Sequence, residues 1–248
     1  MAYWTAIQIL TQVAGELGLP RPNTIVSSTD VQSVQLLSAL NSAGNDLVTL
    51  YPWEQFGKEW TFDTVEDQGT YDLPVDWSYA RDMTQWDRTN HWPLLGPKSP
   101  QEWAWLKGGL MATAPRTRFR VLDNKLQLWP VPAAGVDDSF SPYTLSMEYI
   151  RSTWVQPTGD VDPTEMITLD SDTCLFNPWL LVKYTKVKWY QLKNFEGVAK
   201  VEADFANLFN RLTGKDVGAG VLSLAPTLPP QFIGPWNIPD GSWNTGAF

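Results

Sequence analysis

Hydrophobic residues at helical spacing predict two helices near the start of the chain. In residues 5–17 the spaced apolar positions are Ile7, Leu10, Ala14 and Leu17, and Gly18 follows as a helix stop. A second helix is expected from Asp30, a favourable N-cap residue, to Leu50, before Tyr51 and Pro52. We expect its apolar stripe to consist of Val31, Val34, Leu37, Leu40, Leu47 and Leu50.

Helical spacing returns near the C-terminus, after a loop from Gln156 to Asp172. Asn177 and Pro178 predict the start of one helix, and Gly197 separates it from another that ends at Gly214. The spaced residues are Leu181, Tyr184, Val187, Lys188 and Leu192 in the first helix and Val201, Phe205, Leu208, Phe209 and Leu212 in the second. These helices are expected to pack with the N-terminal pair as one bundle.

Between these helical ends the hydrophobic period is closer to two, which is typical of strands. Trp60, Phe62 and Thr64 alternate with polar residues, and so do residues 143–149. The clearest hairpin pairs residues 118–122 with 125–130 through Asp123 and Asn124, which tolerate positive φ. One short helix is expected at Ser99–Pro100. The middle is thus predicted to be a β-sandwich or barrel.

These patterns together predict an α+β chain in four parts. Residues 1–55 hold the N-terminal helices of the bundle, 56–155 the β-rich insertion, 156–216 a loop and the C-terminal helices, and 217–248 an extended arm. The arm has one charged residue after Val217, Asp240, and four large aromatic ones: Phe232, Trp236, Trp243 and Phe248. Disordered tails usually carry charge and few aromatics. We therefore expect these four to contact a neighbouring subunit or partner, with a free tail as the alternative.

Composition limits the classes of function. The chain has 248 residues, 43% hydrophobic and 18% charged, which is typical of a globular protein. Its net charge of −9 argues against a surface that neutralises phosphates, although an acidic wall beside passing DNA stays possible. Fourteen Trp exceed what one small core readily buries, so some are expected at subunit contacts. Sugar-binding platforms are the competing interpretation.

The residues offer little basis for catalysis. A single histidine, His91, supports neither a Ser-His-Asp arrangement nor a multi-His metal site. The single cysteine, Cys174, cannot form an internal disulfide, and its apolar neighbours predict a small buried hydrophobe. We expect no enzyme activity, no cofactor and no metal. Paired carboxylates beside Trp platforms would also suit a glycan-degrading protein, a possibility that the sequence allows without supporting.

Two charged groups leave alternatives open. Acidic residues crowd the loop at Asp160, Asp162, Glu165, Asp170 and Asp172. Their spacing does not match an EF-hand, so turn-forming and capping roles are favoured over a Ca²⁺ site. Arg116, Arg118 and Arg120 alternate along a predicted strand and so share one face. They either face solvent or contact an acidic partner. No signal peptide and no membrane-spanning run is expected.

The order of these sequence segments resembles that in a known family. The helical pair ends in Leu50-Tyr-Pro-Trp53, and the β-rich part contains Tyr71-Asp-Leu-Pro-Val-Asp-Trp77. The hairpin Phe119–Pro132 follows, and a second helical pair begins near Pro178–Trp179. Over about residues 5–215 the chain resembles the head-to-tail adaptor of short-tailed bacteriophages, the tail tubular protein A or gatekeeper group.

This resemblance implies a function as well as a fold. Such adaptors lack enzymatic residues and combine a helical bundle with a β-rich insertion. They form a ring of twelve beneath the portal protein, extend the DNA exit channel without specific DNA binding, and recruit the tail nozzle protein. We accordingly expect a structural protein of the virion neck or tail, assembled in the host cytoplasm away from membranes. The alternatives are a carbohydrate-binding or glycan-degrading virion protein, or another tail or baseplate component.

Overall fold

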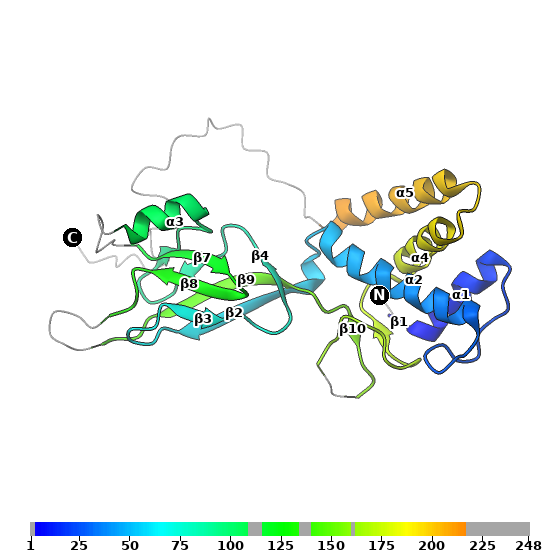
Figure 1. Cartoon of the computed structure of the whole chain (residues 1–248), viewed down its shortest axis with the longest axis horizontal. Coiled ribbons are helices and arrows are strands. Elements are labelled where there is room, and N and C mark those ends of the chain that lie inside the picture. Colours follow the sequence, from blue (N-terminus) through cyan, green and yellow to red (C-terminus); the bar gives the residue numbers. More distant parts are fainter. Residues whose placement is uncertain (1–2, 109–115, 134–139, 160–161, 217–248) are drawn as a thin grey trace, which may run out of the picture. The chain divides into compact units, whose positions relative to one another are not determined.

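The computed structural model describes residues 3–108, 116–133, 140–159 and 162–216 (Figure 1). The fold is α+β, as the sequence predicts. The chain divides into two compact units, a helical unit within Met1–Gly57 and Ile150–Gly220 and a β-rich unit that includes Lys58–Tyr149. The helical unit is therefore discontinuous in sequence. Among the described residues, no helix is long and apolar enough to cross a membrane.

The helical unit is organised around one central helix. Its helices are α1 (Ala6–Leu17), α2 (Val31–Leu50), the short 3-10 helix η1 (Glu54–Phe56), α4 (Pro178–Lys193) and α5 (Val198–Asp216). Helix α4 packs against α1, α2 and α5. A small antiparallel sheet that the sequence pattern did not predict joins β1 (Trp4–Thr5), β11 (Thr173–Cys174) and β10 (Val155–Gln156). Its strands are too short to show a period of two.

Local capping signals set the helix ends where the sequence predicts them. Gly18 ends α1 with a φ of 69°, a left-handed conformation that glycine adopts without a steric penalty. The Asp30 carboxylate accepts a 3.0 Å hydrogen bond from the Ser33 backbone N–H at the start of α2. Asn177 caps α4 in the same way through the N–H of Trp179, at 3.0 Å. These bonds satisfy backbone donors that the helix itself leaves free.

The predicted stripe of α2 is correct at Leu40 and Leu47 and wrong at both ends. Leu40 and Leu47 are fully buried. Val31, Val34 and Leu50 are 66%, 50% and 53% exposed. Positions three apart rotate by roughly 60° per step around a helix of 3.6 residues per turn, so the run from Val31 drifts off the buried face. The face that is buried consists of Leu36, Ala39, Leu40, Ala43, Gly44, Leu47 and Val48.

Helix α2 and Trp154 approach each other closely in the helical unit. The Trp154 ring, which is fully buried, lies so near Gly44 that a Cβ added there would fall 2.2 Å from the ring atoms. The Trp154 indole N–H lies 2.8 Å from the Asn45 side-chain oxygen and 2.9 Å from the Glu165 carbonyl oxygen. The backbone carbonyl of Trp154 also accepts from the Leu175 N–H at 3.0 Å. One side chain thus joins α2 to the segment that leads into α4.

The β-rich unit contains two antiparallel sheets and a short helix. One sheet has the order β2 (Gly57–Asp63), β9 (Thr144–Arg151), β5 (Trp86–Asp87) and β6 (Trp92–Pro93), with β4 (Trp77–Ala80) paired to β9. The other has the order β3 (Thr70–Asp72), β8 (Lys125–Trp129) and β7 (Arg118–Leu122). Helix α3 (Pro100–Lys107) starts at Ser99, as predicted. The β7–β8 hairpin also has its predicted turn, with φ of 54° at both Asp123 and Asn124.

The two sheets share one hydrophobic core. Phe119, Leu126 and Leu128 contribute to it from the three-stranded sheet. Leu145 and Met147 contribute from β9 in the other sheet. Partly buried aromatic side chains pack around this cluster, and the rings of Trp60 and Phe62 stack with their centroids 4.3 Å apart. The alternation read from the sequence therefore identified the inward face of these strands.

Replacing Gly44 by Ala should destabilise the protein, because the new methyl group cannot fit without moving the Trp154 ring. We expect a loss of about 1–3 kcal/mol, as for other overpacked core positions, in urea unfolding. Gly15→Ala is the control, since nothing lies within 4 Å of a Cβ at that position in α1. It should stabilise the protein by about 0.5–1 kcal/mol. Equal effects at the two glycines would contradict the packing described.

Candidate assembly surfaces

Of the three arginines predicted to share a strand face, Arg118 and Arg120 lie in strand β7 and Arg116 lies before it. Arg118 and Arg120 lie opposite Trp129 and Gln127 on the face of the sheet that points away from the core. Arg116 precedes the strand, and its guanidinium lies 5.0 Å from the centre of the Trp92 ring. It lines a cavity of about 120 Å³ together with Asp87, Asn90 and Tyr143, among others. Two of the three arginines therefore share a face as predicted, while the third is held by an aromatic ring.

These arginines differ from most basic residues of the β-rich unit in their ion pairing. The ion pairs there are Lys58–Asp76, Arg81–Glu148, Arg88–Glu59, Lys98–Glu102 and Lys125–Asp72, at 2.6–3.4 Å. By contrast, no carboxylate of the described residues forms an ion pair with Arg116, Arg118 or Arg120. One guanidinium nitrogen of Arg118, Nη1, is buried without a hydrogen-bond partner. A partly desolvated cation without a counter-charge is costly and favours an acidic partner.

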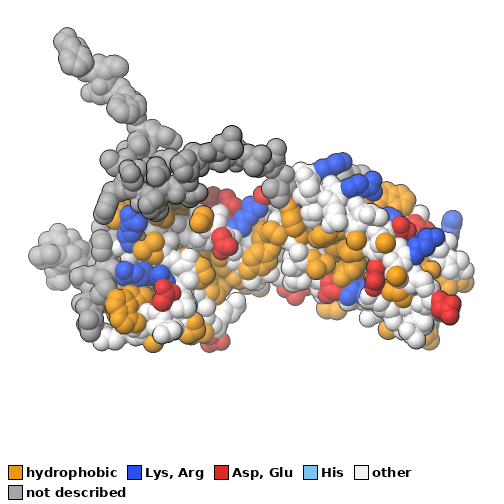
Figure 2. All heavy atoms as spheres, turned by 90° about the horizontal axis from the view of Figure 1, so that it is seen from above, with side chains coloured by type: hydrophobic (Ala, Val, Ile, Leu, Met, Phe, Trp, Pro, Cys, Tyr) orange, Lys and Arg blue, Asp and Glu red, His pale blue; other side chains and the backbone are white. Residues whose placement is uncertain are grey.

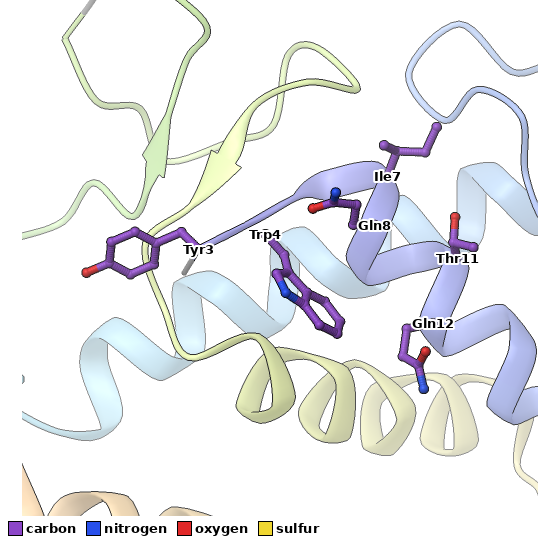
Figure 3. Close-up of a pocket in the computed structure, with 6 residues that line it drawn as sticks. All are labelled: Tyr3, Trp4, Ile7, Gln8, Thr11 and Gln12. Atoms are coloured by element: carbon purple, nitrogen blue, oxygen red, sulfur yellow. The ribbon is translucent and has the colours of Figure 1, made fainter. Parts of the chain in front are cut away.

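A second candidate surface is a groove beside the first helix. It has a volume of about 610 Å³ and is lined by Tyr3, Trp4, Ile7, Gln8, Thr11 and Gln12 (Figure 3). The Trp4 ring lies 5.5 Å from that of Trp179, at the start of α4. Tyr3 and Trp179 are 45% and 48% exposed. All six lining residues are uncharged, so this groove offers aromatic and amide contacts to a partner.

Helix α5 presents a third surface, because it packs on the helical unit with one face only. The predicted stripe from Val201 to Leu212 is confirmed as its less exposed side, yet no residue of α5 is fully buried. Phe205 stacks on Tyr184 with ring centroids 4.3 Å apart. Phe209 lies 5.8 Å from the Trp53 ring. In Figure 2, hydrophobic side chains lie among charged ones on the visible face of both units.

The acidic loop holds the helical unit together. The carboxylate of Asp170 accepts hydrogen bonds from the backbone N–H groups of Ile25 and Val26, the shortest at 2.8 Å. The buried carboxylate of Asp172 accepts from Thr168 and Leu169, both at 2.8 Å. These two residues therefore have the turn-stabilising role favoured from the sequence. In the described part of the chain, no group of three or more His, Cys, Asp or Glu could hold a metal ion.

The pKa of Asp172 reflects two opposing effects. Burial by itself raises this pKa, because it disfavours the charged form. Hydrogen bonds from the backbone N–H groups of Leu169, Thr168 and Thr158 and from the Thr168 hydroxyl favour the charged form. The hydrogen bonds outweigh burial, so the pKa lies below its ordinary value.

The remaining candidates for chemistry have structural surroundings. His91 is exposed in the turn between β5 and β6, with a φ of 57°. That turn is held by the Asp87 carboxylate, which accepts from the backbone N–H groups of Thr89 and Asn90 at 3.0 and 2.9 Å. Cys174 is buried, as predicted, and its burial raises the pKa of its thiol well above the ordinary range. A buried neutral thiol is a poor nucleophile.

Several predicted contact residues lie outside the described part of the chain, and several observed ones were not predicted. The arm residues Phe232, Trp236, Trp243 and Phe248 fall beyond residue 216, and Asp160 falls in the gap at 160–161. The groove residues Tyr3 and Trp4, and Trp179 beside them, were not predicted as contact residues. In the sequence, aromatic residues stand at the beginnings of two predicted helices, which could have indicated these positions. The two helix beginnings come together only through the pairing of β1 with β11, which the sequence did not predict.

Comparison with known proteins identifies one family. A family model described as SU10 adaptor protein matches residues 4–225, which include parts of both units. No curated protein sequence matches the chain.

Replacing Asp172 by Asn should destabilise the helical unit by about 1–3 kcal/mol at pH 7, because buried N–H donors lose their charged acceptor. The folded-state pKa of Asp172 is lowered, so its ionised form stabilises the protein above the unfolded-state pKa. This stabilisation is lost as the pH falls through the folded-state pKa. Urea unfolding of both proteins between pH 7 and pH 3 should show their stabilities converging in acid.

Asp162→Asn is the control for this experiment, because Asp162 is exposed. Its effect at pH 7 should stay within about 0.5 kcal/mol. A difference between wild type and Asp172→Asn that does not depend on pH would contradict the assigned role.

Proposed function

This chain belongs to the SU10 adaptor protein family of phage structural adaptors, and on that premise we propose that it forms the head-to-tail adaptor ring of a bacteriophage virion. In this proposal twelve copies dock beneath the portal protein, extend the DNA exit channel and recruit the tail nozzle protein. Assembly takes place in the host cytoplasm. The observation that carries the proposal is the family match over residues 4–225.

The architecture of the chain suits this role. A helical bundle can serve as the body of each subunit, and the β-rich unit is an insertion in its sequence with a core of its own. The helical unit offers uncharged contacts at the groove beside α1 and at α5. The β-rich unit offers arginines that have no ion-pair partner among the described residues. Surfaces of both kinds are needed when one subunit must contact neighbours and two other virion proteins.

We propose that the chain acts without catalysis. The best-placed carboxylates, at Asp87, Asp170 and Asp172, accept hydrogen bonds from backbone N–H groups and so stabilise turns. A glycan-degrading protein would instead need two carboxyl groups about 5 to 10 Å apart that are free to act on a sugar. Digestion of host polysaccharide by the purified chain, with loss of activity on substitution of a single Asp or Glu, would contradict this proposal.

Native mass spectrometry of the full chain, alone and with purified portal protein, tests the adaptor proposal. We expect a closed ring of twelve that forms alone or when portal is added. Addition of a double-stranded DNA fragment at physiological salt should leave the measured masses unchanged, because a chain of net charge −9 repels phosphates. A chain that stays monomeric at tens of micromolar and does not bind portal would rule the proposal out.

We further propose that the C-terminal arm, whose one charged residue after Val217 is Asp240, contributes to attachment through Phe232, Trp236, Trp243 and Phe248. Deleting Pro226–Phe248 should leave the thermal unfolding midpoint of the isolated chain unchanged within about 2 °C, since both units keep their cores. Binding to portal or to neighbouring subunits should weaken at least tenfold. A large fall in the midpoint of the isolated chain would indicate that the arm belongs to its own subunit.

A further inference from the structure

The two edges of the three-stranded sheet β3-β8-β7 carry opposite charge. Strand β7 is the last strand on one side, and Leu95 and Lys98 hydrogen-bond to its backbone. Arg118 and Arg120 in β7, with Arg116 just before it, form what we call the basic edge. Strand β3 forms the other edge, and the turn that leads into it contains Glu66 and Asp67. Together with Asp63 at the end of β2 they form what we call the acidic turn. We propose that copies of this chain join through these edges, with the basic edge of one copy against the acidic turn of the next. This inference rests on the proposed ring.

The basic edge lacks the counter-charge that most other basic residues of its unit have. The described residues supply an acidic partner for each of Lys58, Arg81, Arg88, Lys98 and Lys125. They supply none for the three arginines, although the chain has 27 acidic against 18 basic residues. In so acidic a chain, three neighbouring unpaired arginines are unexpected. All three are partly exposed, Arg118 and Arg120 on the outward face of β7 and Arg116 beside Trp92, although one guanidinium nitrogen of Arg118 is buried.

The acidic turn is exposed and held in one conformation. The Tyr71 hydroxyl accepts a 3.0 Å hydrogen bond from the Val65 N–H and donates one to the Gln68 carbonyl at 2.9 Å. The Asp67 N–H donates to the Pro132 carbonyl at 2.8 Å. None of Asp63, Glu66 and Asp67 forms an ion pair with a described basic residue. Val65, 51% exposed, adds an apolar contact beside these charges.

The topology requires a second molecule to bring these groups together. Strand β8 lies between β3 and β7, so the basic edge and the acidic turn are on opposite sides of one sheet and cannot meet within one chain (Figure 1). A contact between two different surfaces of identical subunits is heterologous, and repeated contacts of this kind form a ring when the rotation between subunits closes. DNA phosphates are another possible partner for arginines. The overall charge of −9 favours an acidic turn of limited size over a continuous polyanion.

Charge reversal on each side tests the contact. Arg116→Glu/Arg120→Glu reverses the basic edge, and Glu66→Arg/Asp67→Asn reverses or removes the charge of the acidic turn. Asparagine is chosen at position 67 because Asp67 has a φ of 54°, which Asn also tolerates. The control is Arg21→Glu/Lys107→Glu on exposed positions outside the candidate assembly surfaces, which changes the net charge by the same amount as the arginine variant. Assembly is followed by native mass spectrometry, and folding by circular dichroism.

Each interface variant alone should assemble at a concentration at least tenfold higher than wild type, whereas the Arg21→Glu/Lys107→Glu control should match wild type. A mixture of the two interface variants should recover assembly to within about threefold of wild type, because each supplies the charge that the other requires. Assembly of wild type should also weaken as salt is raised. If the arginine variant does not fold, the acidic-turn variant and its salt dependence carry the same test.

The outcomes separate this inference from the proposed function. A wild-type chain that does not assemble, with or without portal, contradicts the ring itself. Interface variants that assemble as wild type does, while the wild-type ring forms, overturn this contact alone. The contact is also overturned if the arginine variant assembles normally but loses binding to a double-stranded DNA fragment.

Discussion

The close contact between the Trp154 ring and Gly44 is the constraint on which the helical unit depends. These residues are separated in sequence by the whole β-rich unit, so local helix propensity cannot bring them together. A glycine inside a helix costs stability relative to alanine, and here the absence of a Cβ allows a large ring to lie against α2. The indole N–H also lies within hydrogen-bonding distance of the Asn45 side-chain oxygen and the Glu165 carbonyl oxygen. These contacts fix the orientation of the ring, and the packing on Gly44 fixes how closely it approaches α2.

A unit closed in this way can carry a long insertion without depending on it for its own core. The acidic loop further stabilises the helical unit. Asp170 accepts hydrogen bonds from the segment before α2, and Asp172 stabilises the turn before β11. The β-rich unit has a separate core shared by its two sheets. Partly exposed side chains on its outward faces, such as Arg120, can therefore take part in contacts with other molecules, as a structural adaptor requires.

Sequence reasoning succeeded where the signal is local and failed where it depends on tertiary contacts. Gly18, Asp30 and Asn177 set helix ends through bonds to their own neighbours, and Asp123–Asn124 sets a hairpin turn by its own backbone preference. The β1-β11-β10 sheet could not be predicted, because it pairs two-residue strands from distant parts of the chain. The exposure of Val31 and Val34 follows from which side of α2 faces α4, a choice that apolar spacing alone does not determine.

The same distinction applies to the candidate surfaces. Alternation along β7 predicted that Arg118 and Arg120 share a face, but the lack of an ion-pair partner depends on where the carboxylates lie after folding.

A density map of the intact virion, at a resolution that resolves side chains, tests the central claim most directly. The account predicts a ring of this chain between the portal and the tail nozzle, with each helical unit closed by Trp154 on α2. Finding the chain elsewhere in the virion, or as isolated copies that form no ring, would contradict it.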